Sequence, residues 1–220
     1  MTDPLQLEEN DVKSATLEYR AVFADPIFEA WGRRTELLAS IFRSLKPWIA
    51  LPDIATFDEG SGNARLEFKI PSQRLTITVS LGYLGAVVTL PDWSQLESLL
   101  DIARKTSEGL VSVLGADVRL QHQTLALSMH VLPRGQDLKT AFSRLANPSF
   151  AGALAEEAVA WGFAVYGPSG YRVIDISRVV PGAIYVGLHR VFGASDSPQS
   201  AVAWLRQEED QVLGILGIRV

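Results

Sequence analysis

Residues 64–90 constrain the fold more than any other part of the chain. They contain three extended runs, at residues 64–70, 74–81 and 83–90, which are joined by turns of one to three residues. In the first two runs apolar and polar side chains alternate. Such alternation is typical of strands buried on one side only. Because connections this short join neighbouring antiparallel strands, the pattern predicts a meander with one apolar face.

Other segments supply what such a sheet needs. Apolar residues three and four positions apart predict helices at residues 28–45, from Trp93 to Gly115, and after Pro198. Further strands are predicted at 17–23, 54–58, 125–131, 158–166, 171–179 and 183–192, and short helices at 136–145 and within 147–157. We therefore predict an α+β protein whose antiparallel sheets carry long helices packed on one face.

The order strand, helix, three to four strands, helix occurs twice along the chain. We predict an internal duplication, with a first repeat at residues 15–115, a second at 116–220 and a flexible leader at 1–14, the two repeats forming one compact unit. The alternative, that two α+β halves resemble each other by chance, stays open. The apolar row changes parity between Leu120 and Leu125, which predicts a bulge or bend between the halves.

This order of elements is similar to the duplicated saddle of the TATA-box-binding protein fold and to the helix-grip fold of Bet v 1 and START-like proteins. The resemblance is one of topology and rests on no sequence motif, so it implies no functional residue. It implies a macromolecule on the open face of the sheet in the first case, and a small apolar ligand between sheet and helix in the second. A net charge of −5 and a pI of about 5.3 argue against nucleic acid as a partner.

Composition excludes several classes of protein. The chain has no cysteine, so disulfides, thiolate nucleophiles, iron–sulfur clusters and cysteine-based zinc sites are excluded. Its 47% hydrophobic content is enough to build a core. The first 14 residues are acidic and resemble no export signal, and no segment approaches the roughly 18 apolar residues of a membrane span. We expect a soluble, cytoplasmic protein without membrane insertion.

Catalytic signatures are weak. His130 and His189 lie on predicted strands, and Asp175 lies on a run between them. Two histidines and one carboxylate are the smallest set of ligands for a non-haem iron or related site, and the same groups can carry acid–base chemistry. No short-range histidine spacing supports a site, and ordinary core or surface histidines are the stronger alternative. We expect no metal and no cofactor.

Two further sets of residues are weak candidates for ligand binding. Trp31, Trp93 and Trp204 lie on or at the start of the three predicted long helices, where they would line a pocket or simply pack against the sheet. Glu18 and Arg20 project from one side of the first strand, either toward a polar ligand or only toward water.

Function remains open at this level. The absence of catalytic motifs, and apolar residues on two sides of the C-terminal helix, favour a non-catalytic binding protein. It would engage a protein partner, or a second copy of itself, through the sheet or that helix. A helix-grip carrier or sensor of a small hydrophobic molecule is the first alternative, and an enzyme with a His/Asp site is the second.

Overall fold

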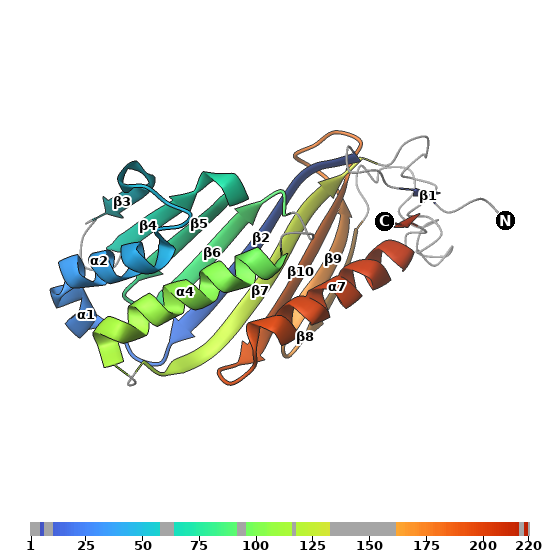
Figure 1. Ribbon diagram of the computed structural model, residues 1–220. Coiled ribbons are helices and arrows are strands. Elements are labelled where there is room, and N and C mark those ends of the chain that lie inside the picture. Colours follow the sequence, from blue (N-terminus) through green and yellow to red (C-terminus); the bar gives the residue numbers. More distant parts are fainter. Residues whose placement is uncertain are drawn as a thin grey trace. The chain divides into compact units, whose positions relative to one another are not determined.

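The computed structural model describes residues 5–6, 11–57, 64–91, 96–115, 118–132, 162–215 and 218–219. The strands are β1 (Leu5–Gln6), β2 (Val12–Phe23), β3 (Ile54–Phe57), β4 (Arg65–Ile70), β5 (Leu75–Ser80), β6 (Tyr83–Thr89), β7 (Leu120–Val131), β8 (Gly162–Gly167), β9 (Gly170–Ile176), β10 (Ile184–Gly193) and β11 (Ile218–Arg219). The helices are α1 (Phe28–Gly32), α2 (Arg34–Leu45), α4 (Leu96–Leu114) and α7 (Pro198–Ile215). The protein is α+β, as predicted (Figure 1).

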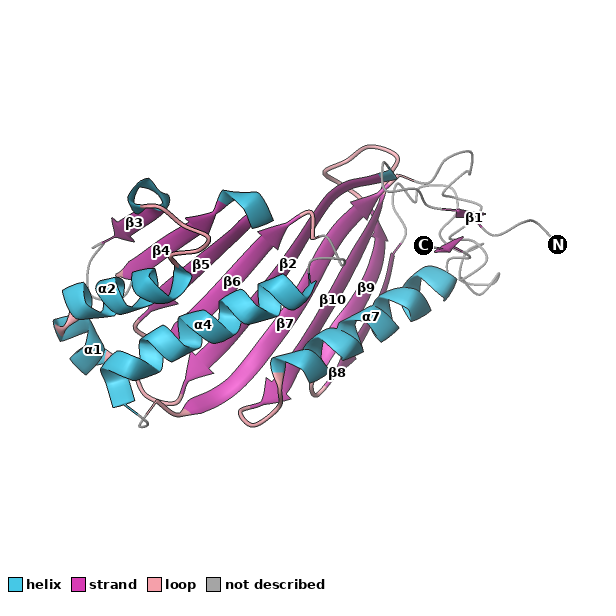
Figure 2. Ribbon diagram, in the orientation of Figure 1, coloured by secondary structure: helices cyan, strands magenta, loops and turns pink. Residues whose placement is uncertain are grey.

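Nine of these strands form one sheet, in the order β3-β4-β5-β6-β2-β7-β10-β9-β8 (Figure 2). β1 and β11 pair separately in parallel. The predicted meander is confirmed, because β4 pairs with β5 and β5 with β6, both antiparallel. Its apolar side chains, among them Leu66, Phe68 and Ile77, are buried.

The helix expected at residues 28–45 is two helices. α1 ends at Gly32, a residue that disfavours helix, and α2 begins at Arg34. Between them Arg33 leaves helical geometry, with φ −107° and ψ 33°, and its carbonyl accepts the backbone N–H groups of Glu36 and Leu37. Arg33 therefore starts the second helix.

Two strands are longer than expected. β2 begins at Val12, within the predicted leader, and Asp11 immediately before it is buried. β7 begins at Leu120 and runs unbroken to Val131, with every second residue buried from Gln123 onward. Gln123, a polar residue, occupies the first buried position of this row, and the apolar Leu120 is only partly buried. The helices predicted at 136–145 and 147–157 lie outside the described residues, as does the start of the strand predicted at 158–166.

The chain divides into two compact units, which we describe separately. Unit 2 comprises residues 16–125 and 191–201. In this unit α2 and α4 cover one face of the strands (Figure 1). The two helices pack closely: Ser40 Oγ lies 2.6 Å from Ser112 Oγ, and a Cβ at Gly109 would lie 3.0 Å from the Cα of Ile41. Ile41, Leu37 and Ile102 are fully buried in this core.

Unit 1 comprises residues 1–15, 126–190 and 202–220. Its described strands include β8, β9 and most of β10, and α7 lies along one face of them (Figure 1). Ile184, Val186 and Leu188 of β10 and Leu205 of α7 are buried in its core. Within the described part of the chain, no helix has the length and apolar character needed to cross a membrane.

Candidate functional site

The strands of unit 1 have one face toward α7 and one face away from it. Arg172 of β9 forms an ion pair with Glu208 of α7, and the guanidinium of Arg190 in β10 lies 5.2 Å from the centre of the Trp204 ring. Even-numbered residues of β9 and β10 therefore face the helix. Because side chains alternate along a strand, the odd-numbered residues of β9 and β10 lie on the opposite face, which we call the open face.

Strand register arranges the open face in three rows. Tyr166, Tyr171 and His189 are direct cross-strand partners and form the first row. The second row contains Ala164, Val173 and Gly187, and the third contains Gly162, Asp175 and Tyr185. The first and third rows carry rings, and the row between them carries small side chains. None of these nine residues is a lysine or an arginine.

Aromatic rings gather on this face. The ring centres of Tyr166 and Tyr171 are 6.0 Å apart, and those of Tyr171 and His189 are 5.1 Å apart and nearly parallel, with 13° between the planes. Tyr185 contacts His130 of β7 at 5.2 Å. These five residues form what we call the ring cluster. Tyr166 is 75% exposed and Tyr171 37% exposed, so the cluster is open to solvent.

Tyr185 lies flat rather than upright. A Cβ at Gly187 would lie 2.9 Å from the Tyr185 hydroxyl, so the ring leans over this glycine. The hydroxyl also lies 3.2 Å from Ser128 Oγ of β7. Partial burial raises the pKa of Tyr171, and its neighbours Tyr185 and Tyr166 add to the effect. The phenols of the cluster are therefore close enough to influence one another.

His130 has one nitrogen engaged within the fold. Its Nδ1 lies 2.8 Å from Ser177 Oγ, and the same oxygen accepts the backbone N–H groups of Val179 and Val180 at 3.1 and 2.8 Å. A hydroxyl oxygen has two lone pairs, so its proton is the group left for His130. Ser177 thus has its hydroxyl proton available to donate to Nδ1. His130 thereby holds the turn after β9 against β7.

The structure places the three candidate catalytic residues on one face without bringing them together. Asp175 of β9 lies opposite Tyr185 of β10. His189 is also in β10, but four residues beyond Tyr185. Four residues of a strand span roughly 13 Å, so Asp175 and His189 lie far apart. Within the described residues, no group of three histidine, aspartate or glutamate side chains is arranged to hold a metal ion.

The candidate ligand-binding residues occupy ordinary structural positions. Arg20 forms an ion pair with Glu18 and lies over the Tyr83 ring, 5.0 Å from its centre, on the face of β2 and β6 away from the buried core. Trp204 contacts Arg190. The pKa of Glu208 is lowered mainly by its hydrogen bond with Arg172, and a hydrogen bond with Trp204 lowers it further. Trp31 is partly buried in α1, and Trp93 lies outside the described residues.

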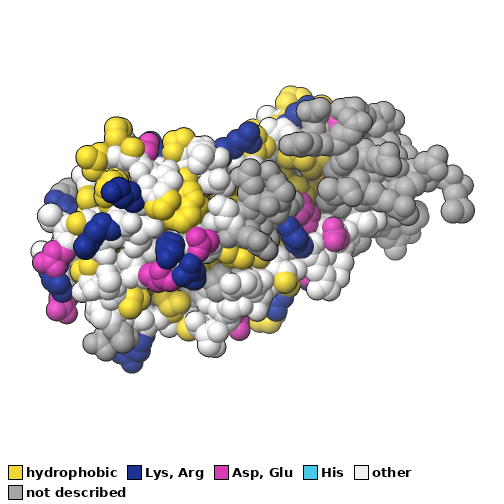
Figure 3. Space-filling model, in the orientation of Figure 1, with side chains coloured by type: hydrophobic (Ala, Val, Ile, Leu, Met, Phe, Trp, Pro, Cys, Tyr) yellow, Lys and Arg dark blue, Asp and Glu magenta, His cyan; other side chains and the backbone are white. Residues whose placement is uncertain are grey.

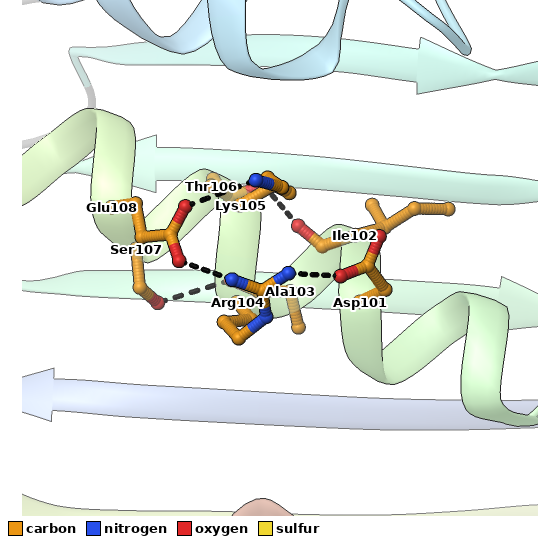
Figure 4. Close-up of polar contacts among 8 residues, drawn as sticks. All are labelled: Asp101, Ile102, Ala103, Arg104, Lys105, Thr106, Ser107 and Glu108. Carbon is orange, nitrogen blue, oxygen red and sulfur yellow. Dashed lines mark hydrogen bonds and ion pairs between the residues drawn. The ribbon is translucent and has the colours of Figure 1, made fainter.

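A second polar cluster, on α4, belongs to the helix surface. Arg104 pairs with Asp101 and Glu108, and Lys105 lies 3.4 Å from Glu108, all at spacings of three or four residues (Figure 4). Exposed pairs of this kind are screened by water and contribute little to stability. Acidic and basic side chains also lie next to one another in the view of Figure 3. These contacts point to no ligand.

Sequence reasoning missed Gln123, a buried polar residue that joins distant segments of unit 2. The amide of Gln123 is buried, and its Nε2 donates to the carbonyls of Gly193, Ala194 and Asp196 at 3.1, 3.3 and 2.8 Å. Its Oε1 accepts the Tyr19 hydroxyl at 2.6 Å. Burial raises the pKa of Tyr19 to about 12. Gln123 ties the loop between β10 and α7 to the core of unit 2.

Comparison with known proteins adds no family. None of the protein-family models searched matches the chain, and no curated protein matches it at the threshold applied. The ring cluster is therefore interpreted from its own chemistry.

Proposed function

We propose that this protein is a non-catalytic binding protein that engages a polypeptide partner through the ring cluster. The observation that supports the proposal is the set of five rings on one face of unit 1, with Tyr166 and Tyr171 exposed. Tyrosine is enriched and charge is depleted at the centres of protein interfaces. Its ring has few rotatable bonds, so it supplies contact area at low entropic cost.

The charges of the open face favour a polypeptide over a nucleic acid. Phosphate binding relies on lysine and arginine, and the three rows contain neither, while Asp175 adds a negative charge. The small side chain of Ala164, which is exposed between the ringed rows, leaves main chain of β8 accessible to a partner's backbone or side chains. The acidic composition and the absence of cysteine support a cytoplasmic location.

We also infer an internal duplication, with long helices packed on one face of the sheet in each repeat. Three observations support it: the sheet order, in which β2 and β7 are central neighbours; the helices α4 and α7, which follow β6 and β10; and a shared Tyr-x-Gly motif in those two strands. In each motif the tyrosine ring covers the glycine, since a Cβ at Gly85 would lie 3.1 Å from the Tyr83 ring.

A displayed library of random peptides, selected on the immobilised full-length protein, tests the binding function. Substituting Tyr171→Ser or Tyr166→Ser should weaken the selected peptides by at least about tenfold, as expected when an interface anchor is lost. Tyr83→Ser, the same change outside the ring cluster, is the matched control and should leave affinity unchanged. Peptides that bind all four proteins equally, or a selection that enriches none, would refute the proposal.

A further inference from the structure

β8 has the properties of a strand prepared for pairing with another strand. It stands at one end of the nine-stranded order formed by the described strands. Five of its six residues are exposed, among them Val165 at 60% and Tyr166 at 75%. Edge strands of monomers usually carry lysine, proline or an inward-pointing charge that blocks pairing. β8 carries none of these between Gly162 and Gly167.

The turn after β8 determines which backbone groups point outward. Gly167 is the direct partner of Gly170 across a two-residue loop, and residues that close such a loop exchange backbone hydrogen bonds. Hydrogen-bonded positions alternate along an antiparallel pair, so Phe163, Val165 and Gly167 bond to β9. The N–H and C=O groups of Gly162, Ala164 and Tyr166 therefore point away from β9.

We propose that β8 pairs antiparallel with β8 of a second copy of this chain, with Ala164 opposite its own counterpart. In this register each outward residue finds an outward partner, and Tyr166 lies opposite Gly162 of the other copy. A ring facing a glycine across a strand pair covers the exposed backbone there. On the other face Phe163 lies opposite Val165, an aromatic and β-branched pair of the kind that stabilises sheets.

The pairing of β8 residues with themselves favours a second copy as the occupant, and charge permits it at this edge. The chain carries a net charge of −5, so two copies repel each other over most of their surface. Residues 162–171 contain no charged side chain, and two copies can meet there without placing like charges opposite each other. The contact is small, so the dimer should be weak and depend on concentration. It does not depend on the polypeptide-binding role of the ring cluster.

A charge-reversal experiment tests this pairing with the full-length chain. Sedimentation velocity over a range of concentrations should show a monomer–dimer equilibrium for the wild type. Ala164→Lys and Ala164→Glu should each raise the dissociation constant by about tenfold or more, because like charges then lie opposite each other. Mixing the two variants should restore a heterodimer. Ala203→Lys, an equal charge at an exposed position on α7, is the control.

Three results would overturn the proposal: a wild type that stays monomeric at every concentration, an Ala164→Lys variant that dimerises like the wild type, or mixed variants that fail to reassociate. Circular dichroism verifies that each variant is folded. If substitutions at Ala164 prevent folding, Tyr166→Lys, which places a lysine on the exposed edge opposite Gly162 of the other copy, should likewise raise the dissociation constant. Faster hydrogen exchange at the Gly162, Ala164 and Tyr166 amides on dilution is a further expected result.

Discussion

Replacing Gln123 with leucine should destabilise the protein mainly because the Tyr19 hydroxyl is left without a hydrogen-bond partner. Leucine is of similar size but can accept no hydrogen bond, so the Tyr19 hydroxyl loses its acceptor. A buried donor without a partner costs about 1–3 kcal/mol. The carbonyls of Gly193, Ala194 and Asp196 lie in an exposed loop and can bind water, so their loss adds only about 1–1.5 kcal/mol. We expect Gln123→Leu to cost about 3 kcal/mol in total.

A double-mutant cycle with Tyr19→Phe isolates this effect. Tyr19→Phe alone leaves Oε1 of Gln123 without its donor and should cost about 1.5 kcal/mol. In the double variant neither donor nor acceptor remains, so the cost should be about 2 kcal/mol instead of the sum of about 4.5. Urea unfolding followed by circular dichroism measures all four proteins. If the double variant loses the full sum, the two side chains are not coupled and the explanation is wrong.

Two further predictions concern α4 and α7. Gly109→Ala should destabilise the protein by about 1–3 kcal/mol, because its Cβ would lie 3.0 Å from the backbone of Ile41, whereas Gly214→Ala, with nothing within 4 Å, should stabilise it by up to about 1 kcal/mol. Thermal unfolding compares the two, and equal effects would contradict the close packing of α2 on α4. Burial, aided by Asp210, raises the pKa of Glu209 to about 7. Because the pKa is about 4.5 in the unfolded chain and about 7 in the folded protein, the protonated form of Glu209 contributes fully to stability below about pH 4.5. This contribution, at most about 3 kcal/mol, is lost as the pH rises through 7. Glu209→Gln should remove this part of the pH dependence in urea titrations, and an unchanged profile would show that another group titrates.

Local pattern was sufficient for the meander and the α+β class. The strands of residues 64–81 alternate cleanly, and turns of one to three residues leave antiparallel pairing of the three strands in residues 64–90 as the simplest outcome. Gln123 shows where pattern fails. A polar residue in a buried row is indistinguishable from a change of register unless its partners are known, and these partners lie 70 or more residues away in the chain, on either side of Gln123.

The ring cluster was only partly predictable. The Gly-Pro-Ser-Gly turn was recognised as a hairpin, and a two-residue loop at that turn would have placed Tyr166 opposite Tyr171. Nothing local connects this pair to His189 or His130, because β7, β9 and β10 meet only through long-range pairing. Trp31, Trp93 and Trp204 are candidates because they lie on or at the start of the predicted long helices, yet that position does not separate a ligand contact from a packing contact such as that of Trp204 with Arg190.

Tyr83 lies over Gly85 and Tyr185 lies over Gly187, and each ring can lie flat there because a glycine has no side chain. The atoms nearest to a methyl group at Gly187 would be the hydroxyl and ring atoms of Tyr185. This side chain can rotate to another rotamer at a small energetic cost, while the strand backbone stays in place. A Gly187→Ala substitution would therefore turn the Tyr185 ring from a flat to an upright position. The ring cluster would then present a different surface, while every helix and strand of the fold stays the same.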